Sequence, residues 1–139
     1  MKSLTKLLVF VLAITSLIPL KIGMLTLHDH ANAVEFFGLQ SLSPDIEKIF
    51  LVLGAFILAS MVMPVLAIVW LIKGKSEGFV LSYIVGFIAF ARGALTLINF
   101  ERHGITGARL SVTPMIVGFI ILMITFIAAK QRAIKSKNP

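Results

Sequence analysis

Arg92 is the residue of this sequence that most clearly needs a chemical partner, because it lies inside a long apolar stretch. A charged side chain near the middle of a bilayer costs at least about 2.5–3.5 kcal/mol to insert, so it is seldom kept there unpaired. Helical side chains lean toward the N-terminus of their helix, which would carry Arg92 away from the nearer membrane surface and oppose snorkelling. The guanidinium is therefore expected to point into protein.

Acceptors for this guanidinium are available on other apolar stretches. Pro64 has no N–H, so the carbonyl of Ser60 loses its helical donor. Hydroxyl groups in the first stretch lie at a similar depth, and further polar residues follow Arg92 along the same edge of its helix. The polar residues that we expect around Arg92 are Thr15, Ser16, Ser60, Thr96 and Asn99.

Lys21 places a second positive charge in the outer half, while no carboxylate lies well inside any apolar stretch. Two cations without a buried counterion indicate an anionic ligand, such as a lipid headgroup, a carboxylated metabolite or a quinone-like oxygen acceptor. Alternatively, Arg92 is a structural tether to carbonyl groups or to Glu35, and Lys21 only marks the interface. Both interpretations stay open, and the candidate ligand-binding residues are Arg92, Lys21, Ser60, Ser16 and Asn99.

The three histidines, His28, His30 and His103, predict no metal site. Imidazole groups with Asp29 or Asp45 could bind zinc or copper in principle, but the spacing matches no metal motif. The sequence also lacks paired membrane carboxylates, a glycine-rich phosphate loop and a serine nucleophile elbow. We therefore predict no cofactor and favour a non-catalytic role over an enzymatic one.

The composition indicates that membrane helices must position these residues. Of 139 residues, 58% are hydrophobic and 14% are charged, whereas a soluble domain is about half apolar and a quarter charged. Crossing a bilayer takes about 20 mostly apolar helical residues. We expect one domain over 1–139, an all-α up-and-down bundle of four transmembrane helices at about 4–27, 49–72, 78–100 and 110–129. Without cysteine, disulfides and zinc–thiolate or iron–sulfur sites are excluded.

The basic residues predict the orientation, because short connections rich in lysine and arginine stay in the cytoplasm. The N-terminus, the second connection and the tail 130–139 carry eight basic residues against one acid, and the opposite side carries four against five. Both termini are therefore expected in the cytoplasm, in the plasma (inner) membrane of a bacterium. The net charge of +7 is then mostly a topology signal, with the tail facing anionic lipid and no nucleic-acid partner.

A cleaved signal peptide is the alternative to a first membrane helix. Lys2 and Lys6 precede an apolar run, and Ala31-Asn32-Ala33 has the small-x-small pattern of a cleavage site. The 13 residues that separate the run from this site favour an uncleaved helix. Cleavage after Ala33 would leave three spans, and intact mass distinguishes the two cases.

Small residues follow one face of the third stretch at steps of three and four. Such residues let helix backbones approach closely, which is how membrane helices gain packing energy. The second stretch is expected to kink at Pro64, and segment 31–42 is expected to form a short interfacial helix that caps the bundle or, alternatively, gates a ligand. The residues of the expected packing face are Gly78, Ser82, Gly86, Ala89 and Gly93.

Three short motifs accompany these spans: EFFGL at 35–39 after the first span, Glu47 with Gly54 at the start of the second, and Ala91-Arg92-Gly93 within the third. In this order they resemble the DoxX-like group of small four-helix bacterial membrane proteins. The sequence departs from that group in lacking an arginine near the start of the first span and an acid within the last. Members of that group are largely uncharacterised, and some are associated with quinone-linked oxidation of sulfur compounds, so the resemblance implies little about activity.

These features predict a small multi-pass membrane subunit or scaffold that binds lipid or a partner membrane protein through the small-residue face, or assembles as a homo-oligomer. An alternative is an oligomeric carrier or channel for a small anion, using Arg92 and Lys21. A quinone- or lipid-linked membrane enzyme subunit is a third possibility, disfavoured because no general base or nucleophile lies at membrane depth.

Overall fold

The computed structural model describes residues 3–36, 43–103 and 108–137, and every element in these ranges is a helix. The expectation of an all-α protein with four spans is confirmed, because four helical stretches are long and apolar enough to cross a membrane. These stretches are Ser3–His28, Glu47–Ile72, Glu77–Ile98 and Val112–Ile134. The helices are α1 (Ser3–His28), α2 (His30–Phe36), α3 (Pro44–Ala59), α4 (Val62–Ile72), α5 (Glu77–His103) and α6 (Ala108–Lys137).

The second span consists of two helices rather than one kinked helix. The backbone leaves the α-helical pattern at Ser60 and Met61, where the amide of Met61 donates to the carbonyl of Leu58 at 3.0 Å. This break lies immediately before Pro64, which cannot donate to the carbonyl of Ser60. The expected kink at Pro64 therefore takes the form of a two-residue interruption between α3 and α4.

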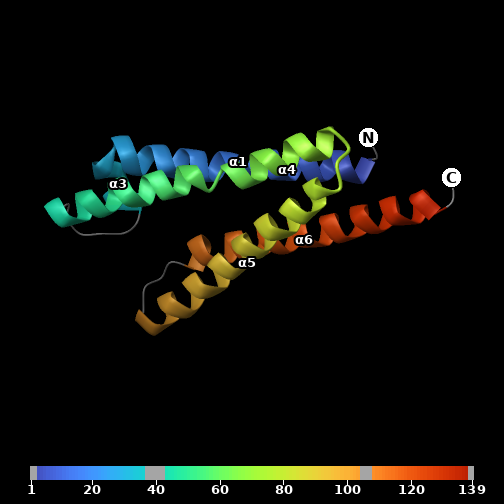
Figure 1. Cartoon of the computed structure of the whole chain (residues 1–139). Helices are drawn as coiled ribbons and strands as arrows, with labels where there is room; N and C mark the ends of the chain where they lie inside the picture. The colour runs from blue at the N-terminus through green and yellow to red at the C-terminus, as the bar shows by residue number, and fades with distance from the viewer. Residues whose placement is uncertain (1–2, 37–42, 104–107, 138–139) are drawn as a thin grey trace.

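The helices form two antiparallel hairpins, one of α1 with α3 and α4, the other of α5 with α6 (Figure 1). The α4–α5 turn joins the hairpins at the end where both chain termini lie, which we call the closed end. Gly74 in this turn has φ +71°, a conformation that residues with a Cβ rarely adopt. Toward the other end, which we call the open end, the hairpins diverge, and α3 does not pack extensively against α5 or α6 in the described residues.

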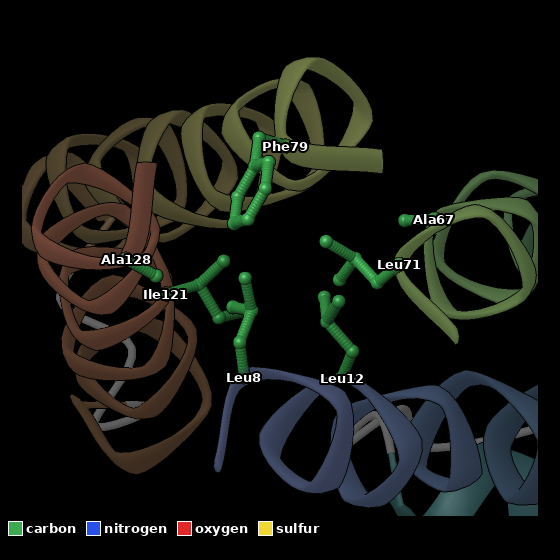
Figure 2. Close-up of a cluster of buried hydrophobic side chains, with 7 residues drawn as sticks. All are labelled: Leu8, Leu12, Ala67, Leu71, Phe79, Ile121 and Ala128. Carbon is green, nitrogen blue, oxygen red and sulfur yellow. The ribbon is translucent and has the colours of Figure 1, made fainter. Parts of the chain in front are cut away.

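The hydrophobic core lies near the closed end, where all four spans meet. Its side chains converge from α1, α4, α5 and α6 (Figure 2). Leu8, Leu12 and Ile121 are fully buried there. The complete cluster consists of Leu8, Leu12, Ala67, Leu71, Phe79, Ile121 and Ala128.

Arg132 ties the end of α6 to the α4–α5 turn. Its guanidinium donates a hydrogen bond to the carbonyl of Gly74 at 2.6 Å and lies over the ring of Phe79, 5.8 Å from the centroid. The tail beyond residue 130 was expected as a basic juxtamembrane segment, and here it continues α6 to Lys137. The closed end is thus held by a core and by a polar tie.

At the open end, α2 turns the chain back across the end of α1. The helix covers only His30–Phe36, and the rest of the expected 31–42 segment lies outside the described residues. Asp29 accepts a bond from the amide of Asn32 at 3.3 Å, and His30 pairs with Glu47 of α3 at 3.3 Å. The first contact lies at the start of α2, and the second fastens α2 to the start of α3.

Candidate functional site

Arg92 lies on one face of α5 together with two side chains that pack against the core cluster. It follows Leu81 by 11 residues, close to three helical turns, and Val85 by two turns, so the three side chains share one face. Leu81 and Val85 pack against the core cluster near the closed end. Arg92 itself is exposed, in the half of α5 toward the open end.

The Arg92 guanidinium forms no hydrogen bond or ion pair with any residue that the structure describes. The backbone carbonyl of Arg92 accepts a bond from the hydroxyl of Thr96 at 2.7 Å, a contact that leaves the charge unused. An unpaired guanidinium at membrane depth retains five donors and a full charge. This side chain is therefore available to an acidic group from outside the described chain.

The polar layer expected around Arg92 is not joined by hydrogen bonds in the described residues. Ser16 is buried, at 8% exposure, and its hydroxyl donates to the carbonyl of Ala13 at 2.7 Å. Ser60 is exposed and donates to the carbonyl of Ile57 at 2.6 Å. Serine hydroxyls in membrane helices commonly satisfy themselves in this way. The side chain of Asn99 lies outside the described residues.

Lys21 is exposed on a different face of the molecule from the core. It precedes Gly23 by two residues, which places it about 200° around α1. Gly23 faces α3, since a Cβ there would meet the side chain of Leu58 at 2.7 Å. Lys21 thus points away from α3, and no contact in the described structure joins it to Arg92.

The small-residue stripe of α5 packs within the chain. Ser82 is fully buried, and Gly78, Gly86 and Gly93 are buried as well. A Cβ at Gly86 would lie 3.1 Å from the carbonyl of Gly118 on α6, and one at Gly78 would lie 2.7 Å from the amide of Leu71. Ala89, on the same stripe, is half-buried. This face is already occupied by α6 and α4, so it does not offer a free surface to a partner protein.

A shallow, open hollow of about 470 Å³ lies on the surface of α3 toward the open end. Val52 and Phe56 each lie two residues from Gly54, which packs against Thr26 and Leu27 of α1, so the hollow lies on the side of α3 away from α1. The hollow is lined by Lys48, Ile49, Val52, Leu53 and Phe56.

The histidines do not form a metal site in the described part of the chain. No group of three metal-ligating side chains occurs there. His30 pairs with Glu47, and its ring lies 6.2 Å from that of Phe50. His28 is exposed at the end of α1, and the side chain of His103 lies outside the described residues.

Comparisons with protein-family models, with curated proteins and with solved structures found no match to this chain. The resemblance to the DoxX-like group therefore stays a prediction. Among the described residues, Arg92 is the charged group inside a span that faces no described partner and lies on the hairpin of α5 and α6.

Proposed function

We propose that the protein is a small non-catalytic membrane subunit that binds an acidic membrane component between its two hairpins. Arg92 supplies the charge that recognises this component. The observation that carries the proposal is the exposure of Arg92 in the open half of α5 without a described partner for its guanidinium. Neutralising an isolated cation in a medium of low dielectric constant is strongly favourable, so an acidic ligand would be held there.

The divergence of the hairpins supports this role over a scaffold built on the small-residue face. That face is filled by α6, whereas the facing sides of α3 and α5 at the open end are not packed extensively against each other. An oligomeric anion carrier using Arg92 and Lys21 is less well supported, because the two cations lie on different faces. The proposed site also needs no general base or nucleophile, in keeping with a binding role.

Native mass spectrometry of the protein extracted in mild detergent tests the proposal. The wild-type protein and a Lys21→Gln variant are expected to retain a co-purifying acidic lipid or metabolite. An Arg92→Gln variant is expected to lose it, and Arg92→Lys is expected to retain only part of it, because lysine lacks the planar fork of donors. Lys21→Gln is the matched control, since it removes a membrane cation from a different face.

Equal retention by wild type and Arg92→Gln would overturn the proposal. So would loss in both charge variants, because that result would reflect total charge rather than a site. Far-UV circular dichroism and the elution volume of each variant establish that it is folded before the masses are compared.

We further propose the plasma membrane of a bacterium as the location, with the closed end facing the cytoplasm. The support is the excess of exposed basic residues at that end in the described chain, against the mixed charges of the open end. The exposed basic residues at the closed end are Lys6, Lys73, Lys75, Lys130 and Arg132.

A further inference from the structure

We infer that the closed end binds an anionic phospholipid, whose phosphate group is held by Arg132 together with Lys73 and Lys75 of the α4–α5 turn. We call these three residues and Glu77 the closed-end cluster. The site lies at the opposite end of the bundle from Arg92 and does not depend on the ligand proposed there. The inference requires that the cluster residues lie together, that Arg132 keeps donors for a ligand, and that the cluster lies at the depth of lipid headgroups.

A hydrogen bond brings the cluster together from two distant parts of the chain. The guanidinium of Arg132 donates to the carbonyl of Gly74 at 2.6 Å. In the sequence, Gly74 lies between Lys73 and Lys75. Glu77 is near enough to Lys75 and Arg132 to interact electrostatically with both. The cluster thus gathers three positive charges against one negative charge.

The side chain of Arg132 is held in place and is still open to a ligand. Its guanidinium lies over the ring of Phe79, 5.8 Å from the centroid, while the bond to Gly74 fixes it to the turn. A guanidinium has five N–H donors, and the bond described for Arg132 uses one of them. Because Arg132 is exposed, its other donors can bind two oxygens of one phosphate group.

The cluster lies where the polypeptide leaves the membrane. The second span ends at Ile72 and the third begins at Glu77, so the short connection between them lies at one surface of the bilayer. Arg132 lies at the same level, because it contacts Gly74 in that connection. The headgroups of the lipids occupy this region, so the cluster meets phosphate groups at its own depth.

Apolar side chains next to the cluster favour a lipid over a soluble phosphate compound. Ile72 directly precedes Lys73, and Val80 directly follows Phe79. Both Ile72 and Val80 are exposed and lie within the spans, on the membrane side of the cluster. A phospholipid with its phosphate at Arg132 would place its chains along these side chains, which a soluble anion would leave uncovered.

The single tryptophan of the chain is a native reporter for this site. Trp70 lies in the last turn of α4, and its carbonyl accepts a bond from the amide of Lys75 at 2.8 Å. Lipids with brominated chains quench tryptophan fluorescence only at short range. The protein is reconstituted in vesicles of phosphatidylcholine and phosphatidylglycerol in equal amounts, with bromine on one lipid or the other. We expect the quenching of Trp70 to show phosphatidylglycerol enriched by at least about threefold.

Charge variants separate a defined site from general attraction to a basic surface. Arg132→Gln is expected to remove most of the enrichment. Lys130→Gln is expected to preserve it, because residue 130 lies about 200° around α6 from residue 132. Glu77→Gln is expected to raise it, since this variant removes the negative charge of the cluster. Absence of enrichment in the wild type, or equal losses in Arg132→Gln and Lys130→Gln, would overturn the inference. Should Arg132→Gln fail to fold, Lys75→Gln removes another exposed cation of the cluster and is expected to lose part of the enrichment.

Soluble glycerol phosphate separates the two sources of the phosphate group. At millimolar concentration and constant ionic strength it is expected to leave the enrichment unchanged, whereas its removal of the enrichment would overturn the assignment to a lipid. Arg92→Gln is expected to leave the quenching of Trp70 unchanged and, in native mass spectra, to keep this lipid while losing the ligand at Arg92. Failure of one proposal is therefore distinguishable from failure of the other.

Discussion

The two ends of the molecule are built on different principles. At the closed end, four spans share one core, and Arg132 adds a hydrogen bond between α6 and the α4–α5 turn. At the open end, each hairpin is packed internally, while the hairpins themselves diverge. In the described residues, two charged side chains lie well inside a span, Lys21 and Arg92, and Arg92 belongs to the open end.

This difference teaches how a small bundle can hold an unpaired charge. Because tertiary packing between hairpins is concentrated at the closed end, the open end can spread around a ligand without disrupting the core. A charge placed among Leu8, Leu12 and Ile121 would have to be desolvated completely. At the open end the same charge can be met by an acidic group from the membrane.

Truncating the core at the closed end is the strongest test of this contrast. Leu12 is fully buried, so Leu12→Ala removes packing from all four spans and is expected to lower the free energy of unfolding by about 2–5 kcal/mol. Phe56→Ala, at a position 72% exposed at the open end, is expected to change it by no more than about 0.5 kcal/mol. Denaturation in mild detergent, followed by circular dichroism, measures both variants. Similar losses would show that the ends do not differ in packing.

Adding a methyl group where two helix backbones meet compares the hairpins with each other. A Cβ at Gly118 would collide with the amide of Phe90 and lie 2.6 Å from the carbonyl of Gly86, so Gly118→Ala is expected to cost about 1–3 kcal/mol. At Gly23 the nearest atoms belong to the flexible side chain of Leu58, so Gly23→Ala is expected to cost less. Thermal unfolding of both variants gives the order, and a larger loss for Gly23→Ala would contradict it.

Removing the polar tie at the closed end is expected to have a smaller effect. Arg132→Gln loses the bond to Gly74 and the contact with Phe79, but the side chain is exposed, so the cost is expected to stay below about 1 kcal/mol. Lys130→Gln removes a neighbouring charge without a described contact and is the control. If the two variants unfold at the same temperature, the contacts of Arg132 with Gly74 and Phe79 add no stability beyond that of one positive charge at this end.

The closed end was more predictable from the sequence than the open end. Long apolar stretches and short connections predict four spans and antiparallel hairpins, because the bilayer demands complete helices. The steps of three and four along Gly78, Ser82 and Gly86 indicate a packing face from helical periodicity alone. These patterns are local, so one sequence is enough to read them.

The arrangement around Arg92 depends on tertiary geometry that local patterns do not contain. Nothing in the sequence shows that the hairpins diverge, so Ser16 and Ser60 were expected near Arg92 although their hydroxyls bond within their own helices. Gly118 was also missed as the partner of Gly86, because a single glycine on the last span forms no stripe. The hollow on α3 was not predicted either, because the sequence does not show which side of α3 other helices leave uncovered.

The orientation of the two ends can be tested without disturbing either, because the chain has no cysteine of its own. Lys75→Cys labels an exposed position at the closed end, and Asp45→Cys labels an exposed position at the open end. On intact bacterial cells that express the protein, a membrane-impermeant maleimide is expected to react with Asp45→Cys and to reach Lys75→Cys only after permeabilisation. The opposite pattern would place Arg92 nearer the inner leaflet and make that leaflet the source of the acidic component.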